Sequence, residues 1–116
     1  MKILIIEDDE SVAELLVKVL SPRYDVFVAR DGVEGVEKFI TEKPDLVLMD
    51  IELPKMNGVN ATKEIKKIDP NAKVIVITAY AVQRGQEALD GGAMEVISKP
   101  FRIKYLLEKL EKALES

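Results

Sequence analysis

Short apolar runs alternate along the chain with longer stretches in which apolar residues recur at helical spacing. The runs lie at 3–6, 26–29, 46–49, 74–77 and, more weakly, 96–97. All but the second follow the continuous apolar pattern that is typical of strands buried on both faces of a parallel sheet. The pattern therefore predicts five strands, each followed by a helix.

The helical stretches show one apolar face each. Over 12–20 the apolar residues recur at i, i+3, i+4, i+7 and i+8, and 33–40 and 103–114 behave in the same way. Turn-forming residues separate these helices from the strands that follow them. They are Ser21-Pro22, Lys43-Pro44, Asp69-Pro70-Asn71 and Gly91-Gly92.

The helix expected over 82–90 has the weakest pattern of the set. Gly85 costs it about 1 kcal/mol relative to alanine. Only Val82, Ala88 and Leu89 offer this helix apolar contacts.

Five βα units predict an α/β fold with an open, doubly wound, five-stranded parallel sheet, because right-handed crossovers place helices on both faces. The 116 residues fit one domain over 1–116, and 47% hydrophobic with 33% charged residues suits a globular protein with a core. No segment approaches the ~20 apolar residues of a membrane span, and the apolar start is too short for a signal peptide. We therefore expect a cytoplasmic protein with no membrane partner.

The composition excludes several kinds of chemistry. The chain has no histidine and no cysteine, so it contains no Ser-His-Asp triad, no thiol nucleophile and no Cys/His zinc site. Any metal is then a hard cation held by oxygen. The net charge of −4 and the pI near 5.0 argue against direct nucleic-acid binding.

Polar residues follow the apolar runs at the points where the strands are expected to end. The run 7–10 is entirely acidic, Asp50 follows the third strand, Thr78 the fourth and Lys99 the fifth. Sites in open parallel sheets form outside the carboxyl ends of the strands. We therefore expect three carboxylates, a hydroxyl and an ammonium to meet at one edge.

Such an acidic cluster has a defined chemistry. Two carboxylates about 4 Å apart repel by about 4 kcal/mol at an effective dielectric near 20, so the cluster either protonates one member or binds a cation. With few oxygen ligands the fitting cation is Mg²⁺, which also coordinates phosphate. A carboxylate beside the metal can attack phosphorus to give an acyl phosphate. Thr78 would donate a hydrogen bond to the phosphoryl group, and Lys99 would supply a positive charge.

Plainer explanations apply to some of these residues. Asp9 and Glu10 are better explained as negative charge at a helix N-terminus. An aspartate after a strand is often a turn residue. Here Pro54 and the pair 57–58 already supply the turn, which leaves Asp50 free for chemistry.

The segments Ile-Leu-Ile-Ile-Glu-Asp-Asp-Glu at 3–10, Asp-Leu-Val-Leu-Met-Asp-Ile-Glu-Leu-Pro-Lys-Met-Asn-Gly at 45–58, Val-Ile-Thr-Ala at 76–79 and Lys-Pro-Phe at 99–101 resemble one family. It is the receiver domain of the two-component response regulators, of the chemotaxis-regulator type. The likeness runs over nearly the whole chain. It implies a flavodoxin-like (βα)5 fold with strand order 2-1-3-4-5, in a stand-alone, single-domain response regulator.

The resemblance also implies roles for individual acids. Asp50 would be the phosphoacceptor, and Glu7 and Asp8 the family's acidic pair. Asp8, Asp50 and the backbone carbonyl of Glu52 would ligate Mg²⁺, with Glu7 reaching the metal through water.

By the same resemblance, Thr78 would move to meet the phosphoryl group, Lys99 would pair with it, and the Lys99-Pro100 peptide would be cis. Such a domain catalyses its own phosphorylation on Asp50 and its slow dephosphorylation, and is not a classical enzyme. The family usually carries an aromatic three residues before the lysine, where this chain has Val96. A valine cannot report activation by turning a ring inward.

The function that follows is Mg²⁺-dependent phosphoryl transfer from an external phosphohistidine to Asp50, which switches protein–protein binding in a two-component system or phosphorelay. The expected partners are a sensor histidine kinase or a histidine phosphotransfer protein, docking around 11–15, and an unidentified target. The main alternative is a receiver-like interaction module that works without phosphorylation. A flavodoxin-type flavin carrier fits poorly, because 7–10 would repel its phosphate, and a haloacid dehalogenase-type phosphatase would want an aspartate where Glu52 stands.

Overall fold

The computed structural model describes all residues 1–116, which form five strands that alternate with five helices. The strands are β1 (Lys2–Ile6), β2 (Asp25–Ala29), β3 (Leu46–Met49), β4 (Val74–Thr78) and β5 (Glu95–Ser98). The helices are α1 (Glu10–Leu20), α2 (Gly32–Glu42), α3 (Gly58–Ile68), α4 (Ala81–Asp90) and α5 (Ile103–Glu115). All strand pairs are parallel, in the order β2-β1-β3-β4-β5. The doubly wound sheet and its flavodoxin-like strand order are confirmed.

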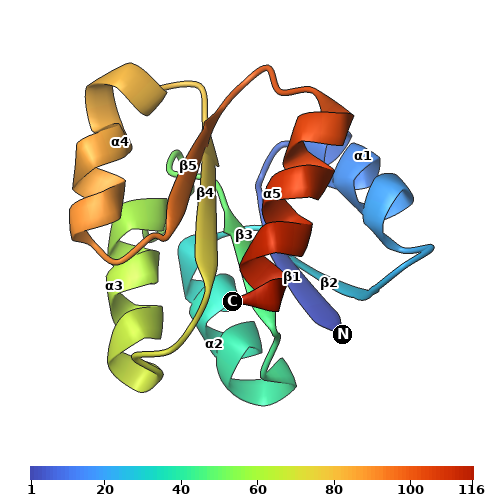
Figure 1. Cartoon of the computed structure of the whole chain (residues 1–116). Helices are drawn as coiled ribbons and strands as arrows, with labels where there is room; N and C mark the ends of the chain where they lie inside the picture. The colour runs from blue at the N-terminus through green and yellow to red at the C-terminus, as the bar shows by residue number, and fades with distance from the viewer.

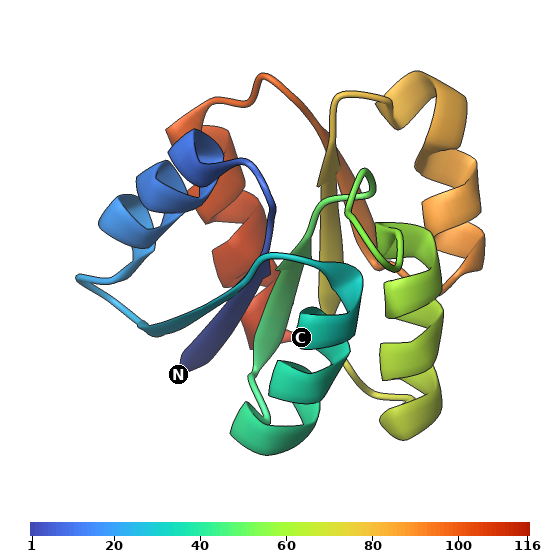
Figure 2. The same cartoon turned by 180° about the vertical axis from the view of Figure 1, so that it is seen from behind.

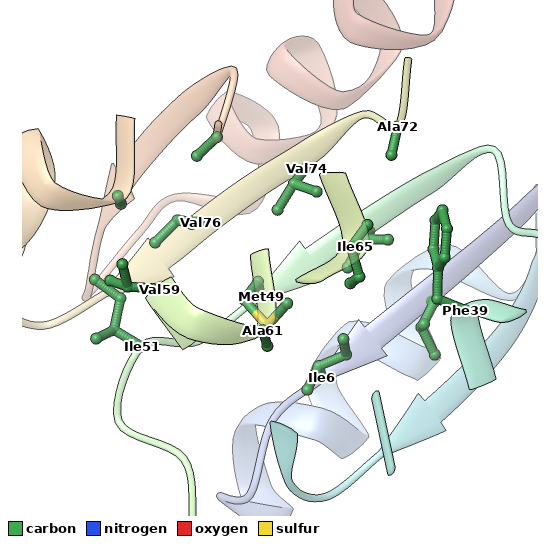
Figure 3. Close-up of a cluster of buried hydrophobic side chains, with 14 of the residues drawn as sticks. Ile6, Phe39, Met49, Ile51, Val59, Ala61, Ile65, Ala72, Val74 and Val76 are labelled. Carbon is green, nitrogen blue, oxygen red and sulfur yellow. The ribbon is translucent and has the colours of Figure 1, made fainter. Parts of the chain in front are cut away.

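Helices cover both faces of the sheet, α1 and α5 on one and α2, α3 and α4 on the other (Figures 1 and 2). Alternate strand residues point to opposite faces, so each strand feeds two cores. Leu16 and Leu110 pack on one face with Ile5, while Phe39 and Ile65 pack on the other, in the cluster that Figure 3 shows. The central strands are buried on both sides, as their continuous apolar runs predict.

Two helical faces are narrower than their sequence patterns suggest. In α1 the buried residues are Ala13, Leu16 and Leu20, whereas Leu15 is 45% exposed. In α2, Ile40 of the expected stripe is likewise 52% exposed. The i, i+3, i+4 pattern defines a broad stripe, but a helix lying on a sheet buries only its central line. Leu15 and Ile40 flank that line and face solvent.

The structure confirms α4 but corrects its contacts. Val82 is 96% exposed and contributes nothing to packing, and Leu89 is also exposed. The buried residues of α4 are Gly85 and Ala88. A methyl group at Gly85 would lie 3.8 Å from Val96 Cγ1, an ordinary contact distance, so the glycine is not demanded by crowding. This helix is attached through two small residues.

None of the five helices has the length and apolarity that crossing a bilayer requires. Both termini lie at the end of the molecule where the strands begin (Figure 1). The opposite end, where the strands finish, carries the polar residues described next.

Candidate functional site

The ends of four strands build the site. Glu7 follows β1, Asp50 follows β3, Thr78 ends β4, and Lys99 follows the last residue of β5. The ladder extends one residue past β3, because the Asp50 amide donates to the Ile6 carbonyl at 3.0 Å. The Lys99 amide likewise donates to the Thr78 carbonyl at 2.8 Å. Backbone pairing therefore fixes where these side chains start.

Lys99 links two acids that are distant in the sequence. Its Nζ lies 2.7 Å from Glu7 Oε1 and 3.3 Å from Asp50 Oδ2. Both carboxylates are buried, and the lysine side chain is 19% exposed. Burial strengthens these charge-assisted hydrogen bonds, since little water competes for them.

A third carboxylate completes the cluster. Oxygens of Glu7, Asp8 and Asp50 all lie within 4.8 Å of one another, and Asp8 is exposed to solvent. When all are ionised, three carboxylates and one ammonium leave two negative charges, the charge that a divalent cation neutralises. The donors are all oxygen and one side is open, so the cluster fits a hard cation such as Mg²⁺, which retains several waters when bound.

The electrostatics of Glu7 reflect this excess of negative charge. Burial, together with the neighbouring Asp50, raises the pKa of Glu7 to about 7, against the lowering effect of Lys99. Burial by itself would lower the pKa of Lys99, but the hydrogen bond to Glu7 and the charges of Asp50 and Glu7 outweigh it and raise that pKa. Lys99 is thus a permanent cation, and Glu7 is the acid that accepts a proton when no other positive charge is available.

The loop after β3 is held close to the strand end. The Ile51 amide donates to Asp50 Oδ1 at 2.8 Å, which orients the carboxylate and leaves Oδ2 toward Lys99. Asn57 caps α3 by accepting from the Asn60 amide, as its place in the turn suggests. Gly58 then lies so near the Asp50 carbonyl that a Cβ there would come within 1.9 Å of the oxygen. Only glycine permits α3 to begin this close to the site.

Thr78 is fully buried at the end of β4. Its hydroxyl oxygen accepts a hydrogen bond from the Tyr80 amide at 3.0 Å. A hydroxyl that accepts one bond still has its own hydrogen to donate. The Thr78 hydroxyl hydrogen is therefore available for the hydrogen bond to a phosphoryl group that its position in the sequence predicts.

Two other sequence expectations are resolved. Asp9 is the N-cap of α1 and accepts from the Val12 amide at 3.2 Å, and Glu10 lies in the first turn. Both therefore serve the helix N-terminus, in agreement with the plainer explanation. The Lys99-Pro100 peptide is cis, as the resemblance implies.

One contact near the site has no precursor in the sequence analysis. The Glu52 side chain accepts from Arg84 Nη1 at 2.8 Å. Arg84 lies in α4, 32 positions further along the chain. The spacing of Arg84 and Glu87 is typical of a pair within a helix, but no pattern connects either residue with Glu52.

Residues 3–111 match the family model for the response regulator receiver domain. The chain is 44% identical over 115 residues to the chemotaxis protein CheY of Thermotoga maritima, covering 96% of each protein. It is 36% identical to sporulation initiation phosphotransferase F of Bacillus subtilis, covering 97% of this chain and 93% of that protein.

A solved structure of similar fold contains a metal. It is the receiver domain of a sensor histidine kinase from Pseudomonas aeruginosa, with a magnesium ion coordinated in its active site cleft. It superimposes with a TM-score of 0.93 at 29% identity and covers 99% of this chain and 98% of that one.

Proposed function

Because the chain belongs to the response regulator receiver domain family of two-component signalling, we propose that it accepts a phosphoryl group on Asp50 from a phosphohistidine of another protein. The observation that carries the proposal is the meeting of two buried carboxylates, Glu7 and Asp50, on the single ammonium of Lys99. A carboxylate can act as a nucleophile toward phosphorus where positive charge compensates the developing anion. The chain has no histidine, so the donor imidazole belongs to the partner.

In the proposed step, a carboxylate oxygen of Asp50 forms a bond to phosphorus while the P–N bond to the donor imidazole breaks. The imidazole leaves with the electron pair and takes up a proton. The product is an acyl phosphate on Asp50, and attack of water on its phosphorus later restores the carboxylate and releases inorganic phosphate. Every bond is made or broken at phosphorus, so no redox partner is needed.

Two further side chains stabilise the transferred group. Lys99 Nζ, now 3.3 Å from Asp50 Oδ2, is close enough to pair with a phosphoryl oxygen bonded at Asp50. Thr78 retains a hydroxyl hydrogen for a second phosphoryl oxygen. The strand ends hold these donors and cations in place before the reaction. They therefore need little reorganisation when charge develops, and this preorganisation is the main source of electrostatic stabilisation of a transition state.

Asp8, Asp50 and the backbone carbonyl of Glu52 are the proposed ligands of Mg²⁺, and Glu7 would reach the metal through a water. The two excess negative charges of the cluster and its all-oxygen donors support this assignment. When bound, the metal supplies positive charge that lets an anionic phosphoryl donor approach three carboxylates. In its absence the same residues would repel the donor.

Incubation with acetyl phosphate and Mg²⁺ tests the chemistry, with intact-protein mass spectrometry as the measurement. We expect the mass to rise by one phosphate, and this gain should disappear with Asp50→Asn or with EDTA. Asp25→Asn is the matched control, because Asp25 is an exposed aspartate that starts β2 at the far end of the sheet. If the parent protein gains no mass, the phosphorylation-independent interaction module becomes the better description.

We also propose where the phosphohistidine partner docks. An apolar groove of about 370 Å³ opens beside Lys99, between α1 and the segment after β5. Val12, Leu15 and Phe101 line it, and Leu15 is exposed although it is apolar. A helix that presents a phosphohistidine could lay apolar residues in this groove and bring the imidazole to Asp50.

Leu15→Glu should block phosphotransfer from autophosphorylated histidine kinases and leave labelling by acetyl phosphate unchanged. Leu89→Glu on α4 is the control, since Leu89 has similar exposure and lies outside the groove. Equal transfer rates for both variants would place docking elsewhere. Loss of acetyl phosphate labelling in Leu15→Glu would show damage to the site itself.

A further inference from the structure

The guanidinium of Arg84 connects α4 to the loop that borders the acidic cluster. Its Nη1 donates to Glu52 Oε1 at 2.8 Å, and its Nε and Nη2 each donate to the Glu87 carboxylate at 3.2 Å. Glu87 lies one turn further along α4 and accepts from the Nε and Nη2 edge of the guanidinium, which leaves Nη1 for Glu52. Arg84 is therefore held from its own helix while it reaches across to the loop.

The geometry and partial burial of the guanidinium favour a stable contact. The hydrogen bonds to Glu87 and then to Glu52 raise the pKa of Arg84, and Arg84 lowers the pKa of Glu87. The Arg84 side chain is 28% exposed, which is low for an arginine on a helix surface. A forked arginine with two carboxylate partners is the geometry in which a surface ion pair does contribute to stability.

Helix α4 packs on β5 and α3 with little buried apolar area, so a polar contact adds to what holds it. Its buried residues are Gly85 and Ala88, which together offer little apolar area. By contrast, α3 buries five residues, among them Val59 and Ile65. Elements with few buried apolar contacts unfold locally at low free energy. A single polar contact therefore raises that free energy by a larger fraction than it would in a well-packed helix.

Glu52 is the residue through which the contact with Arg84 reaches the acidic cluster. Its backbone carbonyl is one of the cation ligands under the proposed function, and its side chain is the group that Arg84 binds. Fixing one part of a residue restricts the other. A cation held at the carbonyl therefore reduces the freedom of the Glu52 side chain, and with it the freedom of Arg84.

We propose that Arg84 is a positioning residue that couples cation binding at the acidic cluster to the attachment of α4, through the side chain of Glu52. The inference rests on the proposed function only in taking the cluster as a Mg²⁺ site. Coupling of this kind is reciprocal. A partner that lifts α4 or captures Arg84 would weaken Mg²⁺ binding by the same factor by which Mg²⁺ weakens that partner.

Hydrogen–deuterium exchange of the α4 amides, with and without Mg²⁺, tests the coupling in the full chain. Isothermal titration on the same samples gives the Mg²⁺ affinity. In the parent protein we expect saturating Mg²⁺ to slow exchange at 84–90 by roughly 2–5-fold, the factor set by a partly exposed ion pair. Arg84→Gln should remove this slowing while still binding Mg²⁺. Glu52→Gln should also remove the slowing, and the double variant should show no more loss than either single one. Glu87→Gln is the matched control. Its side-chain oxygen can still accept from Arg84, and the contact of Arg84 with Glu52 is kept, so this variant should retain the slowing.

The outcomes separate the two proposals. If the parent protein binds Mg²⁺ but α4 exchange does not respond, or if Arg84→Gln keeps the full response, the coupling is refuted and the cation site stands. If the parent protein does not bind Mg²⁺ at all, the cation site and the coupling both fail. Slowing in the parent and in Glu87→Gln alone supports the role of Arg84.

Discussion

Asp50→Asn should stabilise the protein when no metal is bound. Asp50 carries one of three carboxylates gathered around one lysine, so it experiences more repulsion than attraction. Asparagine has nearly the same shape, and its side-chain oxygen can still accept the Ile51 amide. The substitution therefore removes a charge without removing the local hydrogen bond.

The size of the effect follows from the distances. At 4.8 Å, the outer limit for the carboxylate oxygens, and an effective dielectric of about 20, each neighbouring acid repels Asp50 by about 3.5 kcal/mol. The attraction of Lys99 at 3.3 Å is about 5 kcal/mol on the same scale. The two repulsions exceed the one attraction by about 2 kcal/mol. For a domain of this size that corresponds to a rise in Tm of about 8 °C.

Urea and thermal unfolding followed by circular dichroism, in EDTA at about pH 8, measure the difference. Burial and Asp50 raise the pKa of Glu7 only to about 7, so most of Glu7 is ionised at this pH. Asp25→Asn is the control and should change the free energy of unfolding by less than about 0.5 kcal/mol, as expected for an exposed residue with no side-chain partner. Saturating Mg²⁺ should then raise the Tm of the parent protein and leave that of Asp50→Asn nearly unchanged.

A lower free energy of unfolding for Asp50→Asn in EDTA would refute this reasoning, because Lys99 would then compensate Asp50 fully. Equal stabilisation of both proteins by Mg²⁺ would show that the cation binds somewhere other than the cluster. The two measurements thus examine the repulsion and the metal separately.

Three further outcomes are expected from the structure. Burial raises the pKa of Glu7 from 4.5 to about 7. In EDTA, the stability that the protonated Glu7 contributes is therefore complete below about pH 4.5 and is lost as the pH rises through about 7, by ~3 kcal/mol at most. Glu7→Gln should flatten the pH profile of urea unfolding between about pH 5 and about pH 8. Gly85→Ala should raise the free energy of unfolding by about 1 kcal/mol, since the added methyl meets Val96 at contact distance and removes a helix penalty; a fall in Tm would contradict the open space at this position. Gly58→Ala should lower the free energy of unfolding by more than about 2 kcal/mol and weaken Mg²⁺ binding in titration calorimetry, because its Cβ would collide with the backbone beside the site; an unchanged urea midpoint would show that α3 can shift without cost.

The sheet could be predicted because each central strand is a continuous apolar run bounded by turn residues, as at 46–49 and 74–77. The convergence of Glu7, Asp50 and Lys99 followed from the same topology. Strands that run parallel deliver their last residues to one edge, whatever their separation in the sequence.

The remaining features depend on how elements sit against each other. The exposure of Leu15 and Val82 depends on the rotation of each helix about its axis, which a 3.6-residue period defines only within a broad arc. The contact between Arg84 and Glu52 requires the position of α4 relative to a loop from another unit. The sharing of one ammonium by Glu7 and Asp50 likewise needs side-chain geometry, which strand ends alone do not define.

Glu7 and Lys99 lie 92 positions apart, and their contact joins the beginning of the chain to its last strand. During synthesis, the acids after β1 and β3 would emerge well before the lysine that balances them. A nascent or truncated copy would hold an uncompensated acidic cluster and no cation to receive a phosphoryl group. Under the proposed function, the capacity to be phosphorylated therefore depends on a completed fold, and incomplete copies would carry no phosphoryl group.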